Sequence, residues 1–140
     1  MPNWCENELT ITSNNESRTF IHDLNQYIID NEGSFFQYLR PMPEYLLRDS
    51  GKWYDWRVEN WGCKWDASDT EVVHLDEERN SITIHFNSPW APPIDLYDFI
   101  VNLGIGLEVD AIFEEEGMGF YGTYENGKAN INQEEYRYDI

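Results

Sequence analysis

The stretch Glu8-Leu9-Thr10-Ile11-Thr12 decides how this chain folds. Its two apolar residues share one face and its polar residues share the other, which is typical of a half-buried strand. Ser13 and Glu16 then have the spacing of a capping box, which predicts the start of a helix. Apolar residues follow at helical spacing until Gly33 permits a stop. We therefore expect a first helix over about residues 16–31.

Further along the chain, the same periodic patterns return. They predict a two-stranded hairpin, a second helix with one apolar stripe, and two more strands. Asn126-Gly127 is a strong hairpin signal and adds a short last strand. The predicted strands cover 71–75, 81–86, 107–113 and 118–124, and the helical stripe is Leu96, Phe99, Ile100 and Leu103.

Two apolar helical stripes must pack against one face of an antiparallel sheet. The order strand, helix, strand, strand, helix, strand therefore predicts an α+β sandwich of ferredoxin-like topology, with an added C-terminal hairpin. We expect one domain over residues 1–140. Residues 34–70 read as an aromatic-rich insertion, in which Pro41 and Pro43 exclude a continuous helix. Within it, the spacing from Trp53 to Asn60 predicts a short helix that ends near Gly62.

The composition is strongly acidic. The 140 residues include 27 Asp and Glu but only 9 Lys and Arg, for a net charge of −18. Such a field repels phosphate backbones and anionic membranes, so it disfavours direct nucleic-acid binding and membrane association. No signal peptide or long apolar run is evident, so we expect a soluble, cytoplasmic protein.

Four stretches carry a resemblance to a known family: residues 1–11, 53–66, 88–93 and 115–122, which include the block Asn-Trp-Gly-x-Lys-Trp-Asp. Over nearly its whole length the chain resembles the YubB-type ferredoxin-like family of phage- and plasmid-encoded proteins. Cys63 departs from the Thr that we expect there in the family. The resemblance implies the ferredoxin-like fold and a place in the cytoplasm of a host bacterium, and it brings no enzymatic activity.

Acidic residues gather in the C-terminal half. Residues 67–140 contribute −13 of the −18 charges. If 107–113 is a strand, alternate carboxylates project from one face and continue into the following turn. We predict an acidic surface that mimics nucleic-acid phosphates and binds a basic protein, such as a host nucleic-acid-binding or defence protein. The alternative is a face that only keeps the protein soluble. The predicted surface consists of Glu108, Asp110, Glu114, Glu115 and Glu116.

Tryptophans gather between positions 53 and 65, where four of the six lie. Residues 40–64 have a charge sum of +1, in contrast to the rest of the chain. The aromatic and basic residues here could stack on single-stranded nucleic acid or a small ligand, or could form a small core with cations packed on the rings. The alternative ligand-binding set is Trp53, Trp56, Arg57, Asn60, Trp61, Lys64 and Trp65.

Catalytic signals are weak. Cys5 and Cys63 are far apart, which favours two free buried thiols over a mixed site with His74 or His85. No nucleophile motif or phosphate-binding glycine loop is present in the sequence. We predict a non-enzymatic protein without catalytic residues, metal or cofactor. The remaining alternative is a metal-assisted enzyme that uses carboxylate pairs, Glu77/Glu78 or Glu114/Glu116.

Overall fold

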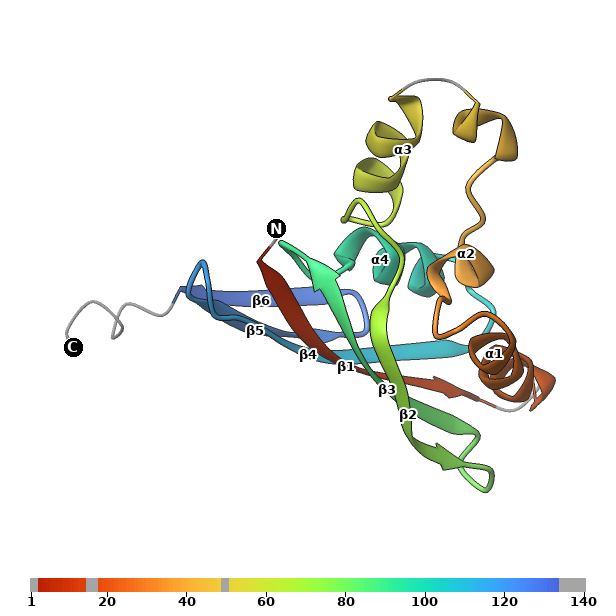
Figure 1. The fold of residues 1–140 in the computed structure, drawn as a ribbon. Coiled ribbons are helices and arrows are strands. Elements are labelled where there is room, and N and C mark those ends of the chain that lie inside the picture. Colours follow the sequence, from red (N-terminus) through yellow and green to blue (C-terminus); the bar gives the residue numbers. More distant parts are fainter. Residues whose placement is uncertain (1–2, 15–17, 49–50, 134–140) are drawn as a thin grey trace.

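The computed structural model describes residues 3–14, 18–48 and 51–133, and within them the chain is α+β with a six-stranded antiparallel sheet and four α-helices (Figure 1). The strand order is β2-β3-β1-β4-β5-β6. The strands are β1 (Trp4–Ser13), β2 (Ser68–Asp76), β3 (Ser81–Pro89), β4 (Leu107–Glu115), β5 (Phe120–Glu125) and β6 (Lys128–Gln133). The helices are α1 (Arg18–Asp30), α2 (Phe36–Leu39), α3 (Lys52–Asn60) and α4 (Ile94–Asn102), with a 3-10 helix η1 (Glu44–Leu47).

Strand β1 lies at the centre of this sheet and is longer than its sequence pattern indicated. It pairs with β3 on one side and with β4 on the other. Its side chains alternate, so that Leu9 and Ile11 are fully buried while Glu6 and Glu8 are exposed. Burial of Leu9 and Ile11 removes apolar area from water, and each side chain stabilises the fold by about 1.5–3 kcal/mol.

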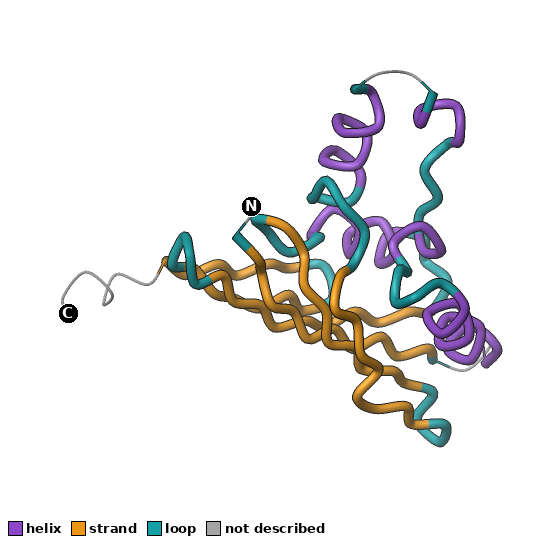
Figure 2. The backbone as a smooth tube through the Cα atoms, viewed as in Figure 1, coloured by secondary structure: helices purple, strands orange, loops and turns teal. Residues whose placement is uncertain are grey.

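The helices cover only one face of the sheet (Figure 2). Each helix buries apolar side chains against the strands, as the two predicted stripes indicated. The assignment of Leu103 to the predicted second stripe is wrong, because α4 ends at Asn102 and Leu103 is 45% exposed. The start of the first helix near Glu16, and with it the capping box, lies outside the described residues. At its end, Gly33 adopts a φ of +93° and its N–H donates to the carbonyl of Ile28 at 2.9 Å. The buried side chains are Ile21, Leu24 and Ile28 in α1, and Leu96, Tyr97 and Ile100 in α4.

Strand β2 differs from its sequence pattern. A strict alternation over the predicted strand 71–75 would place Val73 on the same face as Leu75, but Val73 is exposed, whereas Val72 and Leu75 pack against the core. The register shifts between Val72 and His74. An extra residue at such a bulge moves the following side chains to the opposite face, which a simple alternation does not predict.

The hairpin ends also differ in detail. Strand β4 continues through Glu115, and β5 begins at Phe120 rather than at residue 118, with Gly119 in the intervening turn at a φ of +74°. The last hairpin is confirmed. Asn126 and Gly127 both have positive φ, 39° and 114°, as a tight two-residue turn requires.

The segment between α1 and β2 forms the helices α2, η1 and α3, and α3 with η1 projects away from the sheet (Figure 1). One carboxylate ties the two ends of this segment together. Asp66 accepts hydrogen bonds from the backbone N–H groups of Phe35, Phe36 and Gln37 at 2.9–3.1 Å. These donors lie at the start of α2, where a short helix leaves its N–H groups without partners of their own.

Replacing Asp66 with alanine should therefore destabilise the fold. Asp66→Ala leaves several N–H groups without their acceptor, and we expect a loss of about 2–3 kcal/mol in the free energy of unfolding. Urea denaturation followed by circular dichroism measures it. The control is Glu59→Ala, which removes an exposed carboxylate from α3 and should change stability by less than about 0.5 kcal/mol. Equal effects of the two substitutions would contradict this role of Asp66.

Candidate functional site

The face of the sheet opposite the helices is acidic. Within the described strands, the pairing register brings eight carboxylates to this face. Lys128 is the only Lys or Arg in those strands. We call this surface the acidic face. Its members are Glu6 and Glu8 in β1, Glu71 and Asp76 in β2, Glu108, Asp110 and Glu114 in β4, and Glu125 in β5.

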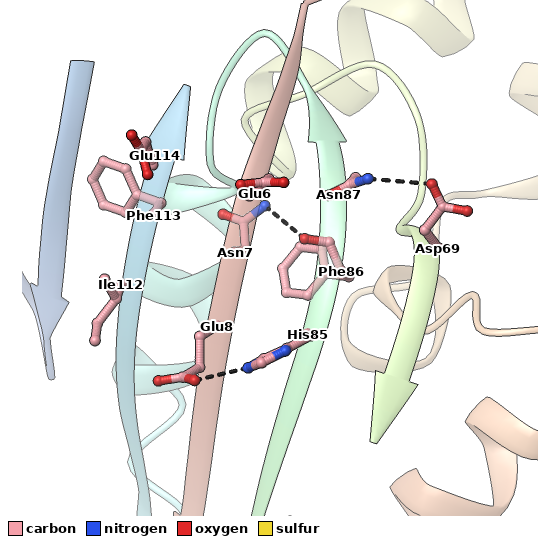
Figure 3. A pocket seen from close by; sticks show the side chains of 10 residues that line it. All are labelled: Glu6, Asn7, Glu8, Asp69, His85, Phe86, Asn87, Ile112, Phe113 and Glu114. Atoms are coloured by element: carbon pink, nitrogen blue, oxygen red, sulfur yellow. Dashed lines mark hydrogen bonds and ion pairs between the residues drawn. The ribbon is translucent and has the colours of Figure 1, made fainter. Parts of the chain in front are cut away.

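A shallow depression of about 450 Å³ lies in the middle of this face, around Glu6 and Glu8 (Figure 3). The Glu8 carboxylate lies 2.7 Å from Nε2 of His85 on the neighbouring strand. Asn87 donates to the Asp69 carboxylate at 3.2 Å on the far side of the depression. The lining therefore combines carboxylates with the apolar side chains of Phe86, Ile112 and Phe113.

Asp110 shows that these carboxylates repel one another. It lies across the ladder from Glu125 and two residues along β4 from Glu108. Partial burial, followed by the negative charges of Glu108 and Glu125, raises the pKa of Asp110 above its ordinary value. Like charges at these positions destabilise the sheet, so the face is electrostatically suited to a cationic partner.

The assignment of Glu115 to the predicted acidic surface is wrong. Glu115 is only 1% exposed, and its carboxylate oxygens accept hydrogen bonds from the N–H groups of Gly117 at 2.6 Å and Met118 at 2.8 Å. It therefore holds the β4–β5 turn from inside and offers nothing to a partner. Glu108, Asp110 and Glu114 lie on the acidic face, and Glu116 is exposed in the turn beside it.

Other members of the acidic face were missed at the sequence level. Glu6 and Glu8 belong to β1, which lies in the less acidic half of the chain, so a charge sum over sequence halves hid them. The signal was present in the alternation from Trp4 to Leu9, where the acidic residues occupy every second position. Pairing of β1 with β4 then places Glu6 opposite Glu114.

Most of the tryptophan block packs into or against the hydrophobic core of the protein. Trp61 is fully buried, and its Nε1 donates to the carbonyl of Arg40 at 3.0 Å, so its assignment to a ligand-binding surface is wrong. Trp53 and Trp56 are half-buried against the core. The Arg57 guanidinium lies 5.1 Å from the Trp53 ring centroid and 5.0 Å from that of Trp61.

The other residues of that predicted set divide between the helix and the loop that follows it. Asn60 donates its side-chain amide to the carbonyl of Trp56 at 2.8 Å. Lys64 and Trp65 follow α3, and Trp65 is exposed. Trp65 therefore remains accessible to a partner, whereas the helix residues are occupied by contacts within the protein.

Both cysteines are free and buried, as the sequence predicted. Burial, with a smaller contribution from Glu115, raises the pKa of Cys5 to about 12. Burial also raises the pKa of Cys63. A thiol that stays protonated at neutral pH is a poor nucleophile and a poor metal ligand.

The described part of the chain contains no cluster of three or more His, Cys, Asp or Glu side chains arranged to hold a metal ion. None of the helices in those residues is long and apolar enough to span a lipid bilayer.

Comparisons with known proteins add little. The sequence matches no family model and none of the curated proteins. Among solved structures, the fold is similar to protein api92 from Yersinia pseudotuberculosis, of the DUF1281 family, with a TM-score of 0.46 and 19% sequence identity. The match covers 61% of this chain and 31% of that chain.

The two classes of carboxylate in β4 should respond oppositely to substitution. Glu115→Ala removes the acceptor of two backbone N–H groups at a buried position, and we expect it to lower the free energy of unfolding by about 2–3 kcal/mol. Glu108→Ala, on the acidic face of the same strand, should be neutral or slightly stabilising because it removes a repelling charge. Chemical denaturation of both variants tests this. A neutral Glu115→Ala would contradict its structural role.

Asp110 should also make stability depend on pH. Because its pKa is raised in the folded state, its contribution favours folding below its ordinary pKa of 3.8 and is lost as the pH rises through the folded value. We expect Asp110→Asn to raise Tm by about 1–2 °C at pH 7, after allowance for solvent screening. The difference should vanish below about pH 4. Thermal unfolding across pH 3.5–7 would contradict this if the difference grew in acid.

Proposed function

We propose that this protein is a non-enzymatic interaction protein whose acidic face binds a basic partner by mimicking nucleic-acid phosphates. The observation behind the proposal is the set of eight carboxylates on one uncovered face, against a single Lys in the described strands. In line with the family resemblance, we propose that the sheet and helices form a ferredoxin-like sandwich. The same resemblance favours a host nucleic-acid-binding or defence protein as the partner.

The sheet arranges these charges as a regular array. Side chains two residues apart on one strand are separated by about 6.5–7 Å, and neighbouring strands by about 4.8 Å. A partner that approaches this face meets several carboxylates at once, on a rigid scaffold. Such a concentration of one sign of charge accelerates association with a basic surface and selects against acidic ones.

The distribution of charge argues against solubility alone as its purpose. Around α3, exposed carboxylates such as Asp55 and Glu59 are offset by basic residues such as Lys52, and residues 40–64 sum to +1. On the acidic face, His85 pairs with Glu8 and Arg79 with Asp76. At Asp110, partial burial and the negative charges of Glu108 and Glu125 raise the pKa. Since repulsion among Glu108, Asp110 and Glu125 costs stability, this cluster of like charges favours a role in binding.

The nucleic-acid alternative through the tryptophan block is less well supported. Trp61 is fully buried, and Trp53 and Trp56 pack against the core. Base stacking needs an accessible ring face next to a basic groove. The residues of this block in α3 offer nucleic acid neither an accessible ring face nor a basic groove while α3 stays packed on the core.

Neutralising part of the acidic face should weaken partner capture. The triple variant Glu108→Gln, Asp110→Asn, Glu125→Gln removes three charges from the face, and we expect recovery of nucleic-acid-binding proteins from a nuclease-treated bacterial lysate to fall about tenfold. The matched control Glu44→Gln, Asp55→Asn, Glu59→Gln removes three charges from η1 and α3, which project away from the sheet, and should leave capture unchanged. Quantitative mass spectrometry of the bound fraction gives the comparison.

Two conditions make this experiment decisive. Captured proteins should be released by about 0.5 M salt, because screening weakens exposed charge pairs. Added duplex DNA should compete for them, since a mimic and its model bind the same surface. Capture that resists both, or that falls equally in the two triple variants, would refute the proposal.

A further inference from the structure

An aromatic surface borders the acidic face at the end where β1 begins. Trp4 opens β1, and the alternation of the strand places its side chain on the same face as Glu6 and Glu8. The Trp65 ring packs against it, with ring centroids 6.1 Å apart and planes tilted by 36°. Trp65 is 38% exposed although it is one of the largest apolar side chains in the protein.

A third tryptophan stands at the same end of the sheet. Trp90 follows Pro89, which pairs with Trp4. The backbone N–H of Trp90 donates to the carbonyl of Asn3 at 2.7 Å. Its φ is +69°, and the N–H of Ala91 donates to the carbonyl of Pro89 at 2.9 Å, which closes a tight γ-turn. This conformation is rare and strained for a bulky residue. We call Trp4, Trp65 and Trp90 the aromatic rim.

The strained backbone at Trp90 carries an exposed side chain. Trp90 is 45% exposed, so the turn does not bury its ring in exchange for the unfavourable backbone. Strained residues of this kind are found where a surface is shaped for binding. Exposed tryptophans are also the commonest source of binding energy at protein interfaces, together with tyrosine and arginine.

The rim is already in contact with a cation. The ammonium group of Lys64 lies 4.3 Å from the centroid of the Trp65 ring. Glu6 lies two residues from Trp4 on the same face, and Glu114 is its cross-strand partner. An aromatic surface beside carboxylates suits a guanidinium better than an ammonium, since the planar group stacks on a ring while its N–H groups pair with a carboxylate.

We propose that the aromatic rim anchors an arginine side chain of the basic partner, with the guanidinium stacked on Trp65 and Trp4 and paired with Glu6. This inference rests on the proposed function, because it names the residue that the partner brings to the acidic face. The acidic face attracts any cationic segment, whereas the rim selects arginine over lysine. Charge complementarity with the adjoining carboxylates identifies the occupant as a basic protein segment.

Two peptides of equal charge separate the two surfaces. Isothermal titration calorimetry at about 0.15 M salt should show octa-arginine binding about 5–30 times more tightly than octa-lysine. Trp65→Leu should remove most of that difference and leave octa-lysine binding within about twofold. Trp65→Phe keeps a ring and should retain an intermediate preference. The matched control is Tyr54→Leu, which removes an exposed aromatic ring from α3 and should have no effect.

Each result bears on one claim. Equal binding of the two peptides, or an unchanged preference in Trp65→Leu, overturns the rim as an arginine anchor while the proposed function survives. Failure of both peptides to bind refutes the acidic face itself. A titration with single-stranded octa-deoxythymidine should not quench tryptophan fluorescence, and saturable quenching that Trp65→Leu abolishes would assign the rim to nucleic acid instead. Unfolding curves of each variant confirm that it is folded.

Discussion

The structure depends on the alternation of side chains in β1. This strand lies between β3 and β4, and every second residue faces the helices, where Leu9 and Ile11 are fully buried. The residues between them face away, so Glu6 and Glu8 occupy the centre of the opposite surface. A shift of one residue in this register would bury carboxylates and expose the core, which fixes both faces at once. The core and the acidic face are therefore two consequences of one pattern.

The protein uses carboxylates in two different ways. Asp66 and Glu115 accept hydrogen bonds from backbone N–H groups at the start of α2 and in the β4–β5 turn, where they hold segments that have no regular partners. Those on the acidic face, such as Asp110, repel their neighbours instead. A total charge of −18 does not separate these roles. Burial separates them, because a buried carboxylate needs hydrogen-bond donors whereas an exposed one is available to a partner.

The arrangement of aromatic residues follows the same division. Trp61 lies within the core, where its ring packs at 5.8 Å from that of Trp56 and its N–H has a carbonyl partner. Trp65 comes four residues later, lies outside the core and contacts the ring of Trp4 at the start of β1. Proximity in sequence suggested one cluster, but the chain turns between these residues. The aromatic rim thus joins the acidic face, while the rest of the block supports α3.

The sequence by itself determined the α+β class, the two helical stripes apart from Leu103, the last hairpin and the free thiols, because each depends on local periodicity, turn chemistry or residue type. It also predicted that Glu108, Asp110 and Glu114 lie together on one acidic surface. The tertiary structure decided what depends on pairing between distant segments. The bulge in β2, the burial of Glu115 and Trp61, and the contact between Trp4 and Trp65 all arise from contacts between residues far apart in the chain. Local patterns hold no information about such contacts, since strand order and register are set by the packing of the whole sheet.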